Sequence, residues 1–317
     1  MRDHLKEYLD KGRAYNVRGL RVLLEYFYAV EQFAPVRATK TPVVSVFGSA
    51  RSKPNKIAFK QGYELGKRLY DSGYAVVTGA SRGVMEATNQ GVSSAILHSL
   101  KKKYPTKSKV ELLQSKSYKR QLKQYSLGLR ISLPFEEKEN PWVGSAATFH
   151  YFMIRKFFFA TLSQAFIACE GGWGTRDELF EMLTLVQTGK NPLMPIIYLS
   201  PEPDHLKADL EHSLRLKYID KEDLHLLNIV KRPGDAVRII RNFYRHVERI
   251  KYPTKDLIRI YWKLPLDRAL EHRFQSLWPH YARYFQKYHW RKTRLELIGF
   301  NARSFGVLRE FINKLNA

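Results

Sequence analysis

The chain has 317 residues, of which 44% are apolar, so it can bury the core of one large domain or of one domain with appended segments. Its 54 Lys and Arg residues exceed its 30 Asp and Glu residues by 24, which favours anionic partners such as nucleotides, nucleic acids or anionic lipid. A charged N-terminus, the lack of an apolar run that could cross a bilayer and a single cysteine argue against a secretory signal, a transmembrane segment and an intramolecular disulfide. We therefore expect a cytoplasmic protein.

The first 40 residues are predicted to form a helical lead-in. Apolar residues recur every three to four positions between residues 20 and 33, which is the spacing of an amphipathic helix. Pro35 is expected to end this helix, because proline has no backbone N–H to donate.

Two strand-turn-helix units follow the lead-in. Residues 43–47 read as a buried strand that ends in a Gly-Ser turn, and a helix is expected from about residue 55 to 72. Residues 74–78 repeat this pattern, with a glycine turn and a helix from about residue 84. Consecutive units of this kind predict a parallel sheet with right-handed crossovers, so the fold class is α/β, a Rossmann-like doubly wound parallel sheet.

The rest of the chain continues the alternation of strands and helices and adds two basic segments. Residues 98–125 are predicted to be an exposed basic insertion, and residues 251–317 a basic, aromatic-rich helical extension of the main domain at 41–250. Further strands are expected at 127–134, 164–169 and 192–200, and helices at 148–163, 175–190 and 233–250 with Asp235 as the N-cap of the last helix.

Glycine turns follow three of the predicted strands, at Gly48, at residues 79–83 and at residues 171–174. A strand that ends in glycine and runs into a helix directs backbone N–H groups at the positive end of the helix dipole, which suits an anion. Tight connections alone can explain one such turn, but three at the same edge of a parallel sheet favour a nucleotide or a sugar phosphate. None has the P-loop spacing, and residues 79–83 do not give GxGxxG, which disfavours kinase, GTPase and dehydrogenase functions.

The segment GGWGTRDE, residues 171–178, resembles the PGGxGTxxE signature of the LONELY GUY (LOG) family, whose members often carry the label "possible lysine decarboxylase". Other segments in the same order are similar to that family: VFGSAR, VVTGASRGVMEATNQG, LGLRISLPFEEKENP and HYFMIRKFFFATLSQAFIA. The resemblance spans roughly residues 41–250. It implies a Rossmann-like homodimer or higher homo-oligomer that hydrolyses the N-glycosidic bond of a nucleoside 5′-monophosphate such as AMP. It implies no cofactor and no metal.

The resemblance also implies roles for individual residues. Arg155 and Glu178 would be the catalytic pair. A carboxylate near the sugar would stabilise positive charge at the anomeric carbon, and the guanidinium would hold phosphate or ribose oxygens. The phosphate would lie on Gly171, Gly172, Gly174 and Thr175. The other residues expected to contact the nucleotide are Gly48, Ser49, Gly79, Gly83, Glu86 and Lys156.

Structural interpretations compete with several of these roles. Thr175 and Glu178 also form T-x-x-E, the pattern of a capping box in which the carboxylate only closes the helix N-terminus. Lys156 could extend to solvent, Glu86 could face solvent, and His150 is expected to pack in the core or at an interface.

Departures from the family pattern motivate other functions. Glu170 stands where the family has proline, and Ala80-Ser81-Arg82 replaces a glycine run, so a binding protein without turnover is an alternative. The extension offers a third hypothesis, nucleic-acid binding, because aromatic and basic residues interleave between residues 281 and 292. The competing interpretation is an amphipathic helix whose aromatic face packs on the domain or across a dimer, with its basic face in solvent. A membrane-surface role is a further alternative.

Overall fold

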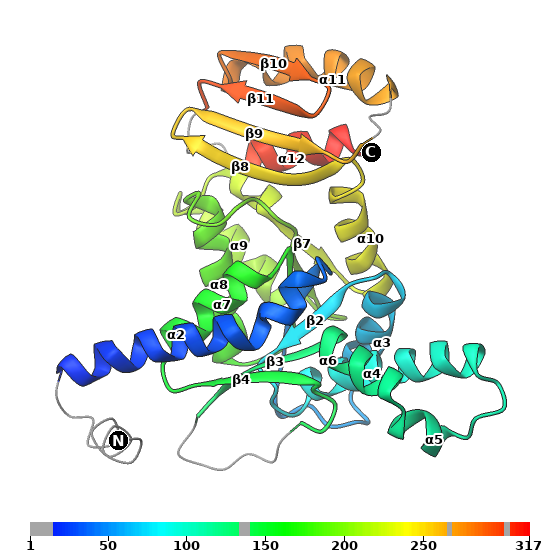
Figure 1. Ribbon diagram of the computed structural model, residues 1–317. Coiled ribbons are helices and arrows are strands. Elements are labelled where there is room, and N and C mark those ends of the chain that lie inside the picture. Colours follow the sequence, from blue (N-terminus) through cyan, green and yellow to red (C-terminus); the bar gives the residue numbers. More distant parts are fainter. Residues whose placement is uncertain (1–14, 133–139, 265–267, 301–304) are drawn as a thin grey trace. The chain divides into compact units, whose positions relative to one another are not determined.

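The computed structural model describes residues 15–132, 140–264, 268–300 and 305–317 (Figure 1). Its main sheet has seven strands in the order β4-β3-β2-β1-β5-β6-β7, and the strand pairs described below are parallel. Helices flank the sheet, so the predicted Rossmann-like α/β class is confirmed. None of the helices in the described ranges combines the length and the apolar character that crossing a membrane requires.

The chain divides into two compact units, which are described separately below. The first unit comprises residues 1–46 and 50–163, and the second comprises residues 47–49 and 164–317. The first glycine turn therefore belongs to the second unit. The domain boundaries at residues 40 and 250 stay a prediction.

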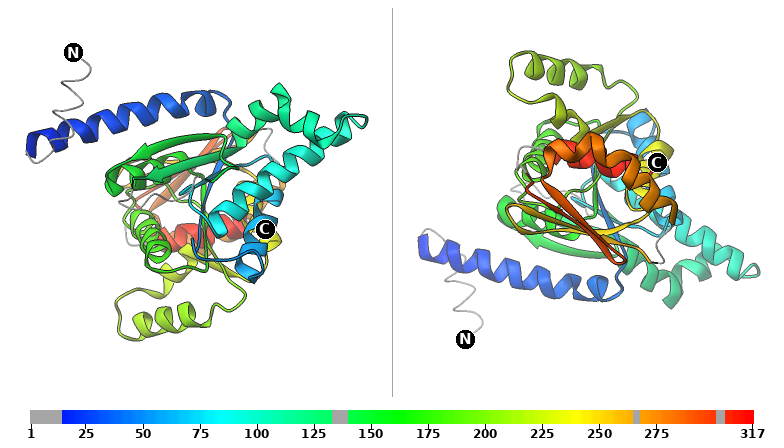
Figure 2. Two further views of the ribbon diagram at one scale, coloured as in Figure 1. Left: turned by 90° about the horizontal axis from the view of Figure 1, so that it is seen from below. Right: turned by 90° about the horizontal axis from the view of Figure 1, so that it is seen from above.

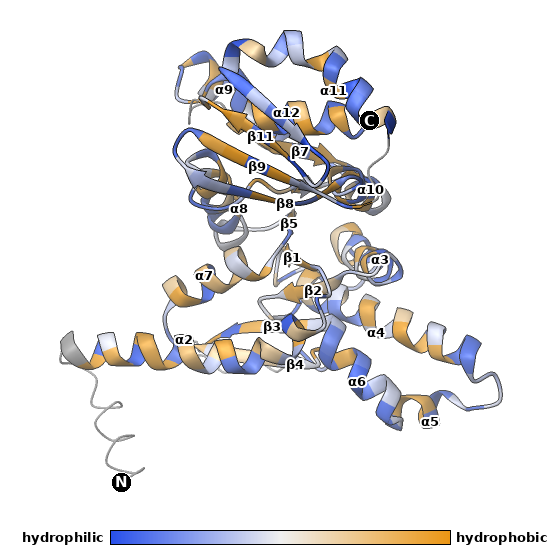
Figure 3. Cartoon of the chain, turned by 45° about the horizontal axis from the view of Figure 1, so that its top comes forward, coloured by the Kyte–Doolittle hydropathy of each residue, from blue (hydrophilic) through white to orange (hydrophobic). Residues whose placement is uncertain are grey.

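The first unit begins with the long helix α2, Tyr15–Ala38. The prediction that Pro35 ends this helix is wrong, because the helix continues past it to Ala38. Pro35 lies in the last turn, where its missing N–H removes one hydrogen bond and little helix remains to be disrupted. Apolar residues recur along α2 (Figure 3), and Leu23 and Phe27 are 55% and 62% exposed.

Four strands of the first unit run side by side. β1, Val43–Phe47, pairs with β2, Ala75–Thr78, which pairs with β3, Ser126–Ile131, and then β4, Ser145–Phe149. The helices between and after these strands are α3 (Ile57–Asp71), α4 (Val84–Lys103), α5 (Lys109–Gln114), α6 (Lys116–Tyr125) and α7 (Phe152–Leu162). The basic insertion is thus helical, and part of the family resemblance, residues 133–139, lies outside the described residues.

In the second unit, three parallel strands carry the rest of the main sheet: β5 (Ala165–Cys169), β6 (Ile196–Leu199) and β7 (Leu227–Val230). Cys169 is buried, as expected for a strand residue. The helices are α8 (Trp173–Gln187), α9 (Asp204–Arg215), the 3₁₀ helix η1 (Lys221–Leu226) and α10 (Pro233–Phe243). Asp235 is not the N-cap of α10, because Arg232 holds that position and pairs with the Asp235 carboxylate at 2.9 Å.

The C-terminal extension contains four strands as well as the helices that were expected. β8 (Val247–Thr254), β9 (Leu257–Trp262), β10 (Lys287–Arg291) and β11 (Arg294–Ile298) form an antiparallel sheet in the order β10-β11-β9-β8. α11 (Arg268–Tyr281), the 3₁₀ helix η2 (Ala282–Tyr284) and α12 (Phe305–Leu315) complete it, and Figure 2 shows α11 and α12 side by side. The sequence missed these strands because their alternating basic residues concealed the strand pattern.

Candidate functional site

The third glycine turn, in the second unit, leads from β5 directly into α8. The helix begins at Trp173, and Gly172 is its N-cap with φ −81° and ψ −155°. No side chain caps this end of the helix. Thr175 therefore lies inside the first turn rather than at the cap, so the alternative that Thr175 and Glu178 form a capping box is wrong.

Gly171 occupies a position where a side chain cannot fit. A Cβ atom there would lie 2.1 Å from the Thr175 Oγ1 atom and 3.0 Å from the Ser49 backbone nitrogen. The turn thus brings the first and third glycine turns together, because the Ser49 N–H also donates a hydrogen bond to the Glu170 carbonyl oxygen at 2.8 Å. Around Gly172 and Gly174, in contrast, the space within 4 Å of a Cβ atom is empty.

Glu178 lies in α8 one turn beyond Thr175, and both residues are buried, with 2% and 7% of their surface exposed. A carboxylate at that depth requires polar or cationic partners to stay ionised. Trp173, at the first position of the helix, is instead 91% exposed. The same helix start therefore combines a buried acid with an exposed aromatic ring.

Glu170 replaces the family's proline, and its side chain is held by a neighbouring strand end. The Ser200 hydroxyl, just after β6, donates a hydrogen bond to the Glu170 Oε1 atom at 2.5 Å. Ser200 also accepts a hydrogen bond from the Glu202 backbone N–H at 3.0 Å. The pKa of Tyr198 is raised, mainly by burial and to a smaller extent by the negative charge of Glu170. No local pattern in the sequence predicts the Ser200 contact, because it joins the ends of two strands that are distant in sequence.

The second glycine turn lies in the first unit between β2 and α4. Gly83 is the N-cap of α4 with φ +68° and ψ −130°, and Ala80 has φ +55°, a region that favours glycine. The Ala80 N–H donates to the Thr78 hydroxyl oxygen at 3.0 Å, and that hydroxyl donates to the Asn89 side-chain oxygen at 2.8 Å. Asn140 donates to the same Asn89 oxygen at 3.1 Å. This buried network holds a turn that lacks the family's glycine run.

Arg155 lies in α7, also in the first unit, and contacts this second turn. Its guanidinium carbon lies 4.9 Å from the ring centre of Phe152 and 5.8 Å from that of Phe159. A Cβ atom on Gly79 would lie 3.9 Å from the Arg155 Nη1 atom, so the guanidinium reaches the glycine turn. The rings restrict its orientation, which suits a group that must bind a ligand oxygen with a fixed fork.

Three further residues of the first unit were considered from the sequence: Glu86, Lys156 and His150. Glu86 is in the first turn of α4 and half-buried, and Lys156 is half-buried beside Arg155. The backbone N–H and ring Nδ1 of His150 both bond the Glu25 carboxylate of α2, the Nδ1 contact at 2.9 Å. His150 therefore joins β4 to the lead-in helix, but the expectation that it packs in the core does not hold, because its side chain is 49% exposed.

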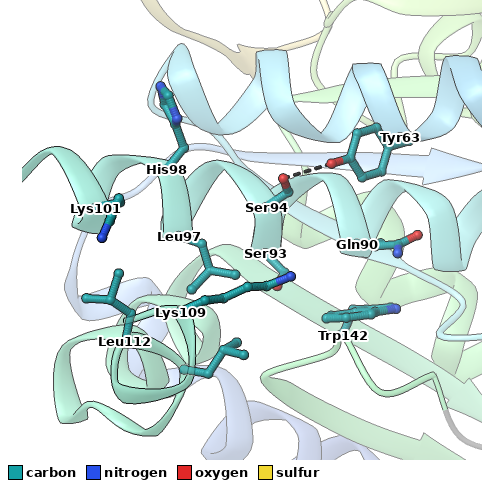
Figure 4. Close-up of a pocket in the computed structure, with 11 residues that line it drawn as sticks. Tyr63, Gln90, Ser93, Ser94, Leu97, His98, Lys101, Lys109, Leu112 and Trp142 are labelled. Carbon is teal, nitrogen blue, oxygen red and sulfur yellow. Dashed lines mark hydrogen bonds between the residues drawn. The ribbon is translucent and has the colours of Figure 1, made fainter. Parts of the chain in front are cut away.

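A cavity of about 490 Å³ in the first unit is separate from these residues (Figure 4). Its walls come from α3, α4, α5 and Trp142, and Lys101 and Lys109 are among the residues that line it. None of the predicted site residues lines it. The structure thus groups Arg155 with Gly79 in the first unit, and Ser49, Glu170, Gly171 and Thr175 in the second, where Glu178 also lies.

These features define a class of protein: a Rossmann-like α/β protein with glycine turns at the starts of its helices. Residues 82–240, 159 of the 317 residues, match the family described as "Possible lysine decarboxylase", and residues 41–98 match the SLOG cluster4 family. The chain belongs to the possible lysine decarboxylase family, the LOG family that the sequence resembles. No curated protein sequence matches it.

Solved structures similar to the chain include proteins of several kinds. One is the molybdenum cofactor binding protein of Rippkaea orientalis, with 21% identity, a TM-score of 0.41 and coverage of 63% of this chain and 96% of that one. A second is the molybdenum cofactor carrier protein of Chlamydomonas reinhardtii, with 18% identity, a TM-score of 0.38 and coverage of 63% and 96%. A third is DNA processing protein A of Helicobacter pylori, with 13% identity, a TM-score of 0.38 and coverage of 63% and 80%.

Proposed function

We propose that the protein hydrolyses the N-glycosidic bond of a nucleoside 5′-monophosphate such as AMP, releasing the free base and ribose 5-phosphate. The observation that carries this proposal is the buried carboxylate of Glu178, one helical turn beyond a glycine turn that has open space at Gly172 and Gly174. The family supports the proposal, because its signature combines this carboxylate with an arginine in the preceding helix. A nucleoside monophosphate also fits the cytoplasmic location proposed from the sequence.

In the proposed reaction, the 5′-phosphate lies on the N–H groups at the start of α8, where the helix dipole stabilises negative charge. The bond from the anomeric carbon to the base nitrogen breaks, and positive charge develops on the sugar. Glu178 stabilises this charge and accepts a proton from water as the water oxygen bonds to the anomeric carbon. The departing base keeps the electron pair of the broken bond and takes up a proton from solvent. Arg155 binds phosphate or ribose oxygens and offsets the repulsion between the phosphate and Glu178.

The proposal is tested with a panel of purine and pyrimidine nucleoside 5′-monophosphates, with free base measured by chromatography. We expect base release from at least one purine nucleotide, and a loss of at least a hundredfold in kcat for Glu178→Gln. Glu181→Gln, a half-buried acid on the same helix, is the matched control and should keep kcat within threefold. The proposal fails if no nucleotide is hydrolysed or if both variants lose activity equally.

Arg155 requires a separate variant. Arg155→Lys keeps the charge but loses the fork, so it should raise KM for AMP more than tenfold if the guanidinium binds the nucleotide in two places. Lys67→Met, which removes a half-buried cation of α3 that has no proposed role in binding, should change KM by less than threefold. Light scattering on the same samples tests the homodimer that the family resemblance implies.

A second candidate function is nucleotide or cofactor binding without turnover. Glu170 and the Ala80-Ser81-Arg82 turn favour it, because both depart from the glycine and proline residues of the hydrolytic pattern. The Ser200 hydrogen bond to the Glu170 carboxylate weakens that argument, since it gives the added charge a local partner. Tight nucleotide binding that Glu178→Gln leaves unchanged, without any product, would select the binding function.

A further inference from the structure

One face of the four-stranded C-terminal sheet is strongly basic. Its outward side chains include six cations, which we call the basic sheet face: Arg249, Lys251, Arg259, Lys287, Arg291 and Arg294. Their register places them across all four strands, because Lys251 is opposite Arg259 and Arg291 is opposite Arg294. Arg249, Lys251, Lys287 and Arg291 are exposed. The charge is therefore spread over a surface rather than concentrated at one edge.

The opposite face of this sheet is the core of the extension. Trp262 and Trp290 lie 5.4 Å apart, and Phe274 of α11 lies 4.9 Å from Trp290. Phe274 in turn contacts Phe311 of α12 at 6.0 Å. Because side chains alternate along a strand, burying this apolar face fixes the basic residues on the other one.

The nucleic-acid hypothesis from the sequence relied on aromatic residues that this packing removes from the surface. Tyr281 and Phe285 are buried, and Tyr288 and Trp290 point to the apolar face. These rings therefore pack within the extension, as the competing interpretation expected, but its expected amphipathic helix is wrong, because residues 287–291 form strand β10. Tyr261 differs, because it lies on the basic sheet face, half-buried, with the Arg249 guanidinium 4.4 Å from its ring centre.

The carboxylate of Glu296 pairs with three arginines of this face. Glu296 accepts hydrogen bonds from Arg259 and Arg294, both at 2.9 Å, and pairs with Arg291 at 3.4 Å. One negative charge cannot balance three positive charges, so the guanidinium groups are held close together with a local excess of two. Guanidinium groups that are already ordered lose little conformational entropy when they bind phosphate oxygens.

The other charges on this face do not remove the excess. Glu248, in the irregular stretch of β8, pairs with Arg249 at 2.9 Å, and His289 lies 3.7 Å from Glu296. Six cations thus face two carboxylates among the described residues of this surface. A net charge of this sign over four strands attracts a polymer of phosphates more than a single small anion.

The geometry further distinguishes single-stranded from duplex nucleic acid. Three inter-strand gaps of about 4.8 Å make the face about 14 Å wide, and a duplex major groove of about 12 Å does not admit it. A single strand can instead lie on the surface, with its phosphates on the cations and a base against an aromatic ring. Tyr261 is the ring that this face offers.

From these observations we propose that the basic sheet face, with Tyr261, binds single-stranded nucleic acid through its phosphates. The proposal does not depend on the hydrolase function, because every residue that carries it lies in the four-stranded sheet of β8–β11.

The test measures binding of the whole protein to labelled U20 and dT20 oligonucleotides across a salt series. The test variant is R249A/K251A/K287A/R291A, and the matched control K190A/K207A/R215A/R241A removes four exposed cations elsewhere in the same unit. Each phosphate contact contributes about 0.7 to the slope of log K against log salt. The test variant should lose about 3 in slope and at least tenfold in affinity, and the control should keep both. The two oligonucleotides distinguish RNA from DNA.

A second pair of variants tests Tyr261 without changing charge. Tyr261→Leu should weaken binding about tenfold through lost stacking, whereas Tyr261→Phe should bind as the wild type does. Thermal unfolding of every variant confirms that it folds. The proposal is overturned if neither oligonucleotide binds, or if the test and control variants weaken equally, which would mean an effect of total charge alone. It is also overturned by a preference for duplex of the same length or by binding only to phosphatidylserine vesicles.

Discussion

A glycine in the turn before α8 can be needed for folding or can leave room for a ligand, and Gly174 distinguishes the two roles. A Cβ atom there would meet nothing within 4 Å, and the residue is in the first turn of the helix, so folding does not require glycine. Alanine has a higher helix propensity, and Gly174→Ala should raise the free energy of unfolding by up to about 1 kcal/mol. If the 5′-phosphate occupies the open space, the same variant should raise KM for AMP at least tenfold.

Gly171→Ala is the matched variant, because its Cβ atom would collide with the Thr175 Oγ1 atom. It should lower both stability and activity. Urea unfolding and steady-state kinetics on the two variants measure both quantities. A Gly174→Ala protein that is more stable and fully active would place the phosphate elsewhere.

Glu296 predicts how acid affects the C-terminal sheet. Burial alone would raise the pKa of Glu296, but hydrogen bonds from Arg294 and Arg259 outweigh it and lower the pKa from 4.5 to about 2. A lowered folded-state pKa contributes stability above about pH 4.5, and this contribution is lost as the pH falls toward about 2. Since the arginine side chains are 31% to 54% exposed, solvent screens the pairs, and we expect about 1–2 kcal/mol.

Glu296→Gln should therefore be less stable than the wild type at pH 7, and the difference should shrink toward pH 2. Urea unfolding at several pH values measures this, with the exposed Glu271→Gln as the control. An equal difference at pH 7 and pH 2 would show that packing, not charge, accounts for the loss.

At the scale of elements, helix α12 contains a buried cation. Arg309 is 0% exposed, its Nη2 atom donates to the Asn228 side-chain oxygen at 3.0 Å, and its guanidinium stacks on Phe243 at 4.3 Å. In the described part of the chain, its Nε and Nη1 atoms have no hydrogen-bond partner. Burial lowers the pKa of Arg309 to about 9, so the cost of the buried charge is fully present at pH 7.

Arg309→Met keeps the length of the side chain and removes the buried charge. It should raise the free energy of unfolding by about 1–3 kcal/mol, because a well-packed apolar group avoids the desolvation cost. Chemical unfolding at pH 7 measures the effect, with the exposed Arg283→Met as the control. A loss of stability would show that the Asn228 and Phe243 contacts outweigh desolvation.

Secondary structure was predictable where a strand is buried on both faces. β1, β2, β5 and β6 are mostly apolar, and all their residues are buried. The hydroxyls of Ser45 in β1 and Thr78 in β2 form hydrogen bonds with Ser163 and Asn89. β4 was missed because its sequence, SAATF, is short and partly polar. The four strands of the extension were missed because one of their faces is basic, so alternation had to be recognised through charged residues.

Only the part of the candidate site that consists of consecutive residues was predictable from the sequence. The Gly171–Glu178 segment is local, so its motif was sufficient to select it. The Ser200 contact to Glu170 and the Asn89 contacts to Thr78 and Asn140 join separate strands and helices. No local pattern encodes such contacts, because they depend on how the elements pack.

At the scale of the whole molecule, the excess of 24 positive charges should make stability depend on salt. Like charges repel over distances comparable to the Debye length, which falls from about 30 Å at 0.01 M to about 10 Å at 0.1 M salt. The exposed ion pairs among the described residues oppose this effect, but each contributes little. The melting temperature should therefore rise by several degrees between 0.02 M and 0.3 M NaCl at pH 7.

Differential scanning fluorimetry measures this rise, and the two charge-reduced variants described above, R249A/K251A/K287A/R291A and K190A/K207A/R215A/R241A, supply the comparison. If repulsion is general, each loses four of the 24 excess charges and should show a smaller rise. If the repulsion is concentrated on the basic sheet face, only the first variant should lose the salt response. That outcome would mean that repulsion among the cations of this sheet destabilises it and that an anionic partner would relieve the repulsion. A melting temperature that falls with salt would instead show that ion pairs such as those of Glu296 outweigh repulsion in this protein.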